Sequence, residues 1–215
     1  MIQVYLAETE HLQDPKEYPH LLDIFPEDRR KKILAYARSE SRIQSYGASL
    51  LLYRVLQEYG KTIEDIFYGE HGKPLIEGLF FNVSHSGNRV MCAVSSEAVG
   101  CDIEKIKEGE NLEQRLEKVA KRFFSEQEVR KLEHASEEER KTAFYQIWTM
   151  KESYVKMTGE GLTIPLDCIE FDLDNGNVYR DGERCQCVVN AWESDGYWMS
   201  VCGGEALVEV RKIEE

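Results

Sequence analysis

Three carboxylates have the types and the spacing expected of a metal site. Asp102 and Glu104 lie two residues apart in the β-forming segment 99–104. Residues at this spacing share one face of a strand, so their like charges call for a cation or a proton between them, although exposed acids on an edge strand give the same pattern. Glu152 lies in a helical pattern among mostly apolar neighbours, and a buried carboxylate needs a partner. Because Mg²⁺ prefers oxygen ligands and completes its shell with water and phosphate, the pattern predicts an Mg²⁺ site at Asp102, Glu104 and Glu152.

Lys156 lies one helical turn after Glu152, and Trp148 lies one turn before it, so the three residues share a helix face. Most carboxylate–lysine pairs at this spacing are surface pairs that stabilise a helix by only about 0.2–0.5 kcal/mol. Here the neighbours Ile147 and Val155 are apolar, which indicates that part of the face is buried. The pair is therefore a candidate for a site as well as for a surface contact.

Two further segments carry groups suited to phosphate. Residues 82–87 (Asn-Val-Ser-His-Ser-Gly) end a strand with small polar side chains and a histidine at a turn. This pattern is typical either of a turn with a hydrogen-bonded histidine or of phosphate binding by hydroxyl, imidazole and backbone N–H groups. Lys73 adds a cation in the rigid turn 71–74 (His-Gly-Lys-Pro). Residues 29–32 (Arg-Arg-Lys-Lys) form either a solvated helix face or a set in which one or two cations point at a phosphate.

The elements that must position these groups follow from apolar periodicity and turn signals. Helices are expected from Pro26, over 41–60, over 106–122, after Ser125 and over 137–156. Ser125 is expected to cap its helix, because Glu128 follows it at capping-box spacing. Strands are expected over 2–7, 80–84, 89–94, 99–104, 168–173, 177–179, 185–192, 197–202 and 207–210.

This order of elements predicts an α+β fold made of two similar α/β halves, with antiparallel sheets each packed on a long helix. Strand, helix and strands are followed by helix and strands again, although no repeat is apparent at the level of residues. The halves are expected at 1–100 and 101–215, with the break near 98–106. A cleft between two such halves is a common place for a ligand.

Composition limits the classes of function. The net charge of −13 argues against nucleic-acid or membrane-surface binding, since both need a basic surface. No apolar run reaches the roughly 20 residues of a membrane span, and the N-terminal segment lacks the features of a signal peptide. The six cysteines lack C-x-x-C spacing, so a zinc site is not expected. Buried thiols without an export signal indicate a reducing cytoplasm.

Five motifs in order resemble those of the Sfp-type 4′-phosphopantetheinyl transferases, from about Pro26 to Pro165. They are Gly-Lys-Pro at 72–74, Asn-Val-Ser-His-Ser-Gly at 82–87, Gly-Cys-Asp-Ile-Glu at 100–104, Phe-Phe-Ser-x-x-Glu at 123–128 and Trp-Thr-Met-Lys-Glu-Ser-Tyr-Val-Lys at 148–156. One motif alone is weak, whereas the ordered set is specific. The resemblance implies that the two halves form a pseudo-dimer, with CoA and Mg²⁺ in the cleft between them.

The resemblance further implies a transfer reaction. A serine hydroxyl of an apo acyl or peptidyl carrier protein attacks the β-phosphate of CoA. The phosphopantetheine arm moves to the serine, and adenosine 3′,5′-bisphosphate leaves. The first half would be the side of the CoA nucleotide, and the second half the side of the metal and the carrier. The enzyme is expected to act as a cytoplasmic monomer.

Carried over by motif, the site residues fall into three groups. The metal ligands would be Asp102, Glu104 and Glu152, and Lys156 would reach the pyrophosphate. Glu152 forms the catalytic pair with Lys156, because its place in the site also suits a general base for the serine, acting directly or through water. Contacts to CoA would come from Lys31 and His85 at the 3′-phosphate, Ser84 at a phosphate, Lys73 and Pro74 at the adenine nucleotide, and Asp102 and Lys156 at the pyrophosphate. Asp28 stands where some family members have a lysine, and Arg29 or Arg30 could replace that cation.

Two other functions fit the same residues. One is a module that binds CoA or a carrier without catalysis, although the four residues Asp102, Glu104, Glu152 and Lys156 exceed what binding alone needs. The other is an Mg²⁺-dependent pyrophosphate hydrolase. For the carrier, the segment 118–124 (Lys-Val-Ala-Lys-Arg-Phe-Phe) combines cations with aromatic residues, which predicts either a docking surface or a solvated helix with core phenylalanines.

Overall fold

The computed structural model describes residues 1–69, 71–172, 176–204 and 208–213. Residues 173 and 207, which were predicted as strand ends, lie outside the described ranges. The helices are α1 (Glu27–Leu34), α2 (Ser39–Glu58), α3 (Leu112–Phe123), α4 (Glu126–His134) and α5 (Glu137–Thr158). Short 3₁₀ turns lie at Pro19–Leu22, Ile63–Asp65, Gly161–Thr163 and Leu166–Cys168. Among the residues described, no helix combines the length and the apolar composition that crossing a bilayer requires.

The strands form two large sheets and one small hairpin. The strands are β1 (Ile2–Glu8), β2 (Phe67–Tyr68), β3 (Pro74–Leu75), β4 (Phe80–Ser86), β5 (Arg89–Ser95), β6 (Val99–Lys105), β7 (Ile169–Phe171), β8 (Asn177–Arg180), β9 (Glu183–Ser194), β10 (Tyr197–Gly203) and β11 (Val208–Lys212). The first sheet has the order β11-β1-β5-β4, the second β6-β10-β9-β8-β7, and β2 pairs with β3. Strand pairing is antiparallel except between β1 and β11. The predicted α+β fold with antiparallel sheets is confirmed.

β11 departs from the predicted division of the chain. It follows the second sheet in sequence, yet it pairs with β1 at the edge of the first sheet, where Ile2 lies opposite Val208. Its parallel pairing is set by a contact between the two ends of the chain, which local periodicity does not report. The segment 101–215 therefore contributes a strand to the sheet of the other half.

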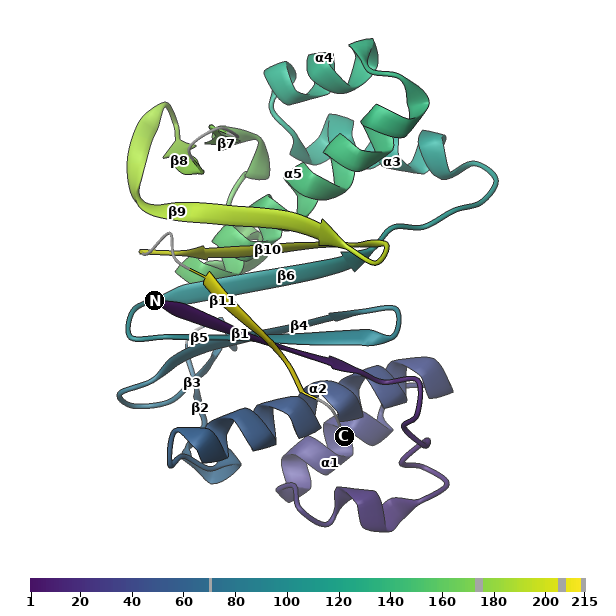
Figure 1. The fold of residues 1–215 in the computed structure, drawn as a ribbon, viewed down its shortest axis with the longest axis vertical. Helices are drawn as coiled ribbons and strands as arrows, with labels where there is room; N and C mark the ends of the chain where they lie inside the picture. The colour runs from purple at the N-terminus through teal and green to yellow at the C-terminus, as the bar shows by residue number, and fades with distance from the viewer. Residues whose placement is uncertain (70, 173–175, 205–207, 214–215) are drawn as a thin grey trace.

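The two sheets pack against each other between two layers of helices (Figure 1). Apolar residues from both sheets fill the space between them, among them Val4 and Met91 from the first sheet and Ile103 and Met199 from the second. The helix α2 covers the outer face of the first sheet through residues such as Leu51 and Val55. The helix α5 covers the outer face of the second sheet, and α3 and α4 pack on α5.

The ends of the helices follow capping rules. Ser125 and Glu128 form the predicted capping box at the start of α4, and Ser136 forms a second one with Glu139 at the start of α5. Each box satisfies backbone N–H groups that have no partner inside the helix. Gly159 ends α5 with φ of 76°, a left-handed conformation that glycine adopts without a steric penalty.

α5 packs directly on β6 because the strand carries Gly100. A Cβ atom at this position would lie 2.0 Å from the carbonyl oxygen of Ser153 and 2.3 Å from the backbone nitrogen of Met157. Any side chain would push the helix away from the strand, so the close approach depends on glycine. This approach brings Lys156 of α5 within ion-pair distance of Asp102 on β6.

Candidate active site

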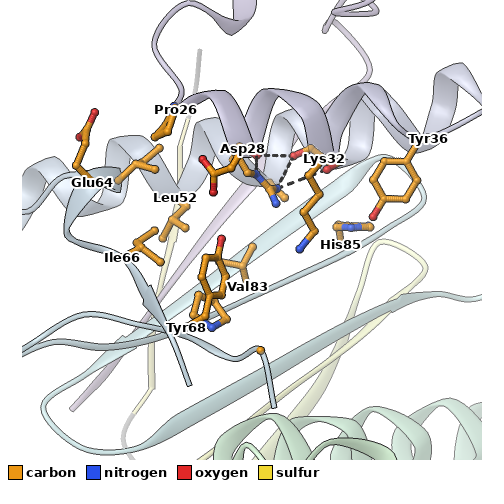
Figure 2. Close-up of a pocket in the computed structure, with 17 residues that line it drawn as sticks. Pro26, Asp28, Lys32, Tyr36, Leu52, Glu64, Ile66, Tyr68, Val83 and His85 are labelled. Atoms are coloured by element: carbon orange, nitrogen blue, oxygen red, sulfur yellow. Dashed lines mark hydrogen bonds between the residues drawn. The ribbon is translucent and has the colours of Figure 1, made fainter. Parts of the chain in front are cut away.

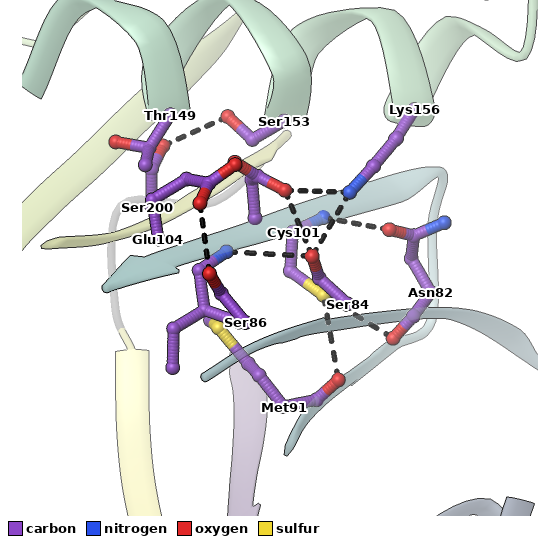
Figure 3. Close-up of polar contacts among 12 residues, drawn as sticks. Asn82, Ser84, Ser86, Met91, Cys101, Glu104, Thr149, Ser153, Lys156 and Ser200 are labelled. Atoms are coloured by element: carbon purple, nitrogen blue, oxygen red, sulfur yellow. Dashed lines mark hydrogen bonds and ion pairs between the residues drawn. The ribbon is translucent and has the colours of Figure 1, made fainter. Parts of the chain in front are cut away.

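The candidate site lies where the edge strand β4 of the first sheet meets the edge strand β6 of the second (Figure 3). Asp102 and Glu104 project from β6 toward α5, on the same face as Gly100. Ser84 and Ser86 approach from β4, and α5 supplies Glu152 and Lys156. The site therefore draws on both sheets and on the long helix of the second half.

Asp102 is the most enclosed carboxylate of the site, with 4% of its surface exposed. Its Oδ1 atom accepts hydrogen bonds from Lys156 Nζ at 2.6 Å and from Ser84 Oγ at 2.8 Å. Its Oδ2 atom is buried and, within the described residues, accepts no hydrogen bond. A buried charged oxygen without a partner is costly, so this atom is suited to a cation. Lys156 therefore forms its ion pair with Asp102. The negative charge of Glu152, one helical turn earlier, also favours the charged form of Lys156.

The negative charge of Asp102 affects the pKa of each of the other two carboxylates. The pKa of Glu104 is raised, first by burial and then by the negative charge of Asp102, and Ser86 Oγ donates to its Oε2 at 2.8 Å. The pKa of Glu152 is raised for the same two reasons in the same order. Lys156 responds in the opposite direction: burial lowers its pKa, but the negative charge and hydrogen bond of Asp102, together with Cys101 and Glu152, raise the pKa overall.

These observations test whether the three carboxylates suit Mg²⁺. In the described part of the chain, no three His, Cys, Asp or Glu side chains are arranged as a ready metal-ligating group, and Lys156 occupies one oxygen of Asp102. However, the donor set consists of carboxylate oxygens, which Mg²⁺ prefers. The unpaired Oδ2 of Asp102 and the mutual repulsion of the acids both favour an added cation. The residues therefore fit the metal in chemistry.

A cavity of about 490 Å³ adjoins this cluster on the side of the first half (Figure 2). It lies between α1, α2, the β2–β3 hairpin and β4. Apolar side chains such as Leu52, Ile66 and Val83 line part of it, while cationic groups line another part. Such a mixed lining suits a ligand with an aromatic portion and an anionic portion.

Two cations, Arg29 and Lys32, and the imidazole of His85 line one part of the cavity. Arg29 Nε donates to Ser49 Oγ at 2.7 Å, and its Nη2 donates to the carbonyl oxygen of Ser45 at 3.1 Å, so the guanidinium is held in place by α2. Burial lowers the pKa of Arg29. The ring of His85 is exposed to the cavity, but burial of its surroundings and the positive charges of Lys156 and Arg29 lower its pKa. Arg29 and Lys32 therefore give this end of the cavity two positive charges that suit an anion, and the neutral His85 ring can add a hydrogen bond, although Asp28 and Glu64 also line the cavity.

Lys31, which was predicted at the 3′-phosphate, lies outside the cavity. Its side chain is 74% exposed and pairs with Glu27 one helical turn earlier, at 2.6 Å. Positions 29 and 32 are three residues apart and share a helix face, whereas position 31 lies on another face. A helical projection groups Arg29 with Lys32, and the cavity also contains Pro26 and Tyr36, which flank α1.

Lys73 lies at the border of the two halves rather than in the cavity wall. Its Nζ donates to the carbonyl oxygen of Met157 at 2.8 Å and to that of Val99 at 3.4 Å. It therefore satisfies a carbonyl in the last turn of α5, where a cation is favourable. Its neighbour Pro74 does line the cavity, together with Tyr68, which sequence reasoning did not select.

In the predicted docking segment 118–124, the aromatic side chains are packed against α5, whereas a lysine is exposed. Phe124 is buried, with 4% of its surface exposed, and stacks on Phe144. Phe123 packs edge-on against Trp148. The two aromatic rings therefore belong to packing around α5, as the core interpretation predicted, while the ammonium group of Lys121 is exposed and pairs with Glu117.

Comparison with known proteins gives concordant results. The family model described as the 4′-phosphopantetheinyl transferase superfamily matches residues 98–202. A 4′-phosphopantetheinyl transferase of Bacillus subtilis is 36% identical over 203 residues, which cover 88% of this chain and 88% of that protein. The 4′-phosphopantetheinyl transferase Sfp of Bacillus subtilis strain 168 is 37% identical over 188 residues, covering 83% and 81% of the two chains. Among solved structures, a holo-(acyl-carrier-protein) synthase from Bacillus anthracis in complex with CoA (3′,5′-ADP) matches with a TM-score of 0.37 and 16% identity, covering 49% of this chain and 92% of that chain.

Proposed function

Because the chain belongs to the 4′-phosphopantetheinyl transferase superfamily, we propose that it transfers the 4′-phosphopantetheine arm of CoA to a serine of an apo acyl or peptidyl carrier protein. The products are the holo carrier and adenosine 3′,5′-bisphosphate. The observation that carries the proposal is the adjacency of a cavity with two cations at one end to the cluster of Asp102, Lys156 and two further acids.

The proposed orientation of CoA follows from this adjacency. The 3′-phosphate lies at Arg29, Lys32 and His85, and the adenine lies against Pro74 and Tyr68. The pyrophosphate then extends toward Lys156, whose charge already lowers the pKa of His85 and therefore lies near it. Residues 1–100 supply the nucleotide side, and residues 101–215 supply the metal and carrier side. The strand β11 belongs to the second range but pairs with β1 in the first sheet.

Asp102, Glu104 and Glu152 are the residues that would hold Mg²⁺. When bound, the ion would supply positive charge to neutralise the pyrophosphate as its bridging bond breaks. The chain's own groups perform the remaining work. Lys156 gives up its bond to Asp102 Oδ1 and places its ammonium group beside the pyrophosphate oxygens, which lowers the cost of the negative charge that develops there.

Glu152 is the proposed general base. Its pKa is raised by burial and by the neighbouring acids, which makes it a stronger proton acceptor than an ordinary glutamate. The serine Oγ forms a bond to the β-phosphorus, the bond from that phosphorus to the bridging oxygen breaks, and the serine proton goes to Glu152. The electron pair of the broken bond stays on the departing adenosine bisphosphate. Positioning of the two reactants accounts for most of the acceleration.

The order of strands supports a pseudo-dimer. In the first sheet the strands β1, β5 and β4 are neighbours in that order, and in the second sheet β6, β10 and β9 are neighbours. Each series places the first strand beside the third, and the third beside the second, and each packs on one long helix.

The protein acts as a cytoplasmic monomer on CoA and a carrier, without nucleic acid or membrane, in keeping with its charge of −13.

Mass spectrometry of intact apo carriers tests the function. Fatty-acid, polyketide and nonribosomal-peptide carriers are each incubated with the protein, CoA and Mg²⁺, with serine-to-alanine carriers as controls. At least one carrier is expected to gain the mass of phosphopantetheine, with release of one equivalent of adenosine 3′,5′-bisphosphate. Binding of CoA without transfer to any carrier would instead indicate a binding module, and cleavage of CoA without a carrier would indicate a hydrolase.

A further inference from the structure

Two strand edges meet at the site without a backbone ladder. Among the strands that the structure describes, β4 pairs only with β5 in the first sheet, and β6 pairs only with β10 in the second. Within the described residues, no backbone hydrogen bond joins β4 to β6. Alternate N–H groups of β6 therefore point toward β4 without the usual acceptors, and unsatisfied N–H groups at a buried edge are costly.

Three side chains of β4 replace the missing ladder (Figure 3). Asn82 Oδ1 accepts from the backbone nitrogen of Cys101 at 3.0 Å. Ser84 Oγ accepts from that of Ile103 at 3.4 Å, and Ser86 Oγ accepts from that of Lys105 at 3.1 Å. Acceptors and donors both recur every second residue, because each strand presents alternate positions to the other. The motif Asn-x-Ser-x-Ser thus matches the edge of β6 position by position.

The two serines also hold the acids of β6. Ser84 Oγ donates to Asp102 Oδ1 at 2.8 Å, and Ser86 Oγ donates to Glu104 Oε2 at 2.8 Å. A hydroxyl has a single proton, so each serine uses its proton on a carboxylate and its lone pairs on the strand edge. Ser84 additionally accepts from Lys156 Nζ at 3.0 Å. Its hydroxyl is therefore engaged on all sides, which leaves no proton for the phosphate contact predicted from the sequence.

We propose that Ser84 and Ser86 are positioning residues that fix Asp102 and Glu104 relative to the first half of the protein. Each serine links β4 to a backbone N–H group and to a carboxylate of β6. These bonds fix the carboxylate cluster in position relative to the nucleotide cavity. The proposal deepens the transferase function and rests on it for its catalytic consequence. The hydrogen bonds themselves are independent of that function.

Amide hydrogen exchange of the protein without ligands tests the bonds directly. In Ser86→Ala, the amide of Lys105 is expected to exchange about tenfold faster, and in Ser84→Ala the amide of Ile103 likewise. Ser200→Ala is the matched control, because its hydroxyl bonds to Ser153 and lies opposite Asp102 on β10. The control should leave the exchange of both β6 amides unchanged. Unchanged exchange of Lys105 in Ser86→Ala and of Ile103 in Ser84→Ala would overturn the proposed contacts.

Kinetics separate positioning from a stabilising role alone. Ser86→Ala is expected to lower kcat about tenfold and to raise the half-saturating Mg²⁺ concentration about tenfold, with KM for CoA within about twofold of wild type. Ser86→Thr keeps the hydroxyl and should restore kcat. If Ser84→Ala raises KM for CoA while kcat and the Mg²⁺ requirement stay unchanged, Ser84 binds phosphate and the proposal is wrong for that residue. If the wild type transfers nothing, the proposed function fails, and amide exchange still decides the contacts.

Discussion

The assignment of the 3′-phosphate to Arg29 rather than Lys31 can be tested with one pair of variants. Arg29→Gln removes a half-buried cation that lines the cavity, and Lys31→Gln removes the exposed cation two residues later. The two changes are chemically matched and lie on the same helix. They differ in the face from which the charge is lost and in the bonds to α2 that only Arg29 makes, so the comparison tests the geometry of α1 once those bonds are controlled for.

The structure sets the expected magnitude. Arg29 commits Nε to Ser49 and Nη2 to Ser45, while no hydrogen bond from its Nη1 to another described residue is present. Nη1 can thus give the phosphate one charge-assisted hydrogen bond, worth about 1.5–3 kcal/mol. This corresponds to a loss of about 10- to 150-fold in CoA affinity for Arg29→Gln. Lys31→Gln should change the affinity by less than about twofold, because the side chain is solvated and bound to Glu27.

Isothermal titration with CoA and with 3′-dephospho-CoA is the appropriate assay. A contact to the 3′-phosphate matters only when that phosphate is present, so the loss for Arg29→Gln should largely vanish with the dephosphorylated ligand. Thermal unfolding of each variant controls for the lost bonds to α2. Equal losses for both ligands would show that Arg29 only supports the helix pair. A larger loss for Lys31→Gln would refute the reasoning and restore the original sequence prediction.

Three further predictions concern the cluster, its packing and acid stability. Asp102→Ala and Glu152→Ala should each lower kcat about 100-fold or more through misplacement of the reactants, with circular dichroism unchanged; near-normal turnover in either folded variant would exclude that carboxylate from the metal site. Gly100→Ala should lower the free energy of unfolding by about 2 kcal/mol or more, measured in urea, because its Cβ would lie 2.0 Å from a backbone oxygen of α5. Asp14 has its pKa lowered mainly by a hydrogen bond from Arg42. Its contribution to stability is therefore present above the unfolded pKa of about 3.9 and is lost as pH falls through the lower folded value, so Asp14→Asn should flatten the fall in Tm below about pH 5; an unaltered slope would contradict that role.

The parts of the fold that depend on local pattern could be predicted from sequence. Alternation over 99–104 predicted that Asp102 and Glu104 share one face of β6, and helical periodicity over 137–156 predicted the face that carries Glu152 and Lys156. The capping box at Ser125 followed from spacing alone. These features depend on bonds and contacts within one turn or one strand, which a single sequence contains.

The parts that depend on distant contacts could not be predicted in the same way. The pairing of β11 with β1 joins the two ends of the chain, and the bond from Lys73 to Met157 crosses from one half to the other. The environment of Lys31 was within reach of a helical projection, but the choice of the correct face required knowing where α1 packs. Composition gave no indication that the serines of residues 82–87 would face the unpaired edge of a strand in the other sheet.

The position of the site explains why its polar groups can be buried between two sheets. Three backbone N–H groups of β6 meet side-chain acceptors from β4, and Ser84 and Ser86 each donate a hydrogen bond to a carboxylate of β6. The bonds that join the halves and the bonds that arrange the acids are therefore the same bonds. A change at Asp102 must affect both the junction and the chemistry, since Lys156 and Ser84 both depend on it. A change at Arg29 affects only the cavity and its support from α2, which makes this residue the cleaner probe of ligand binding.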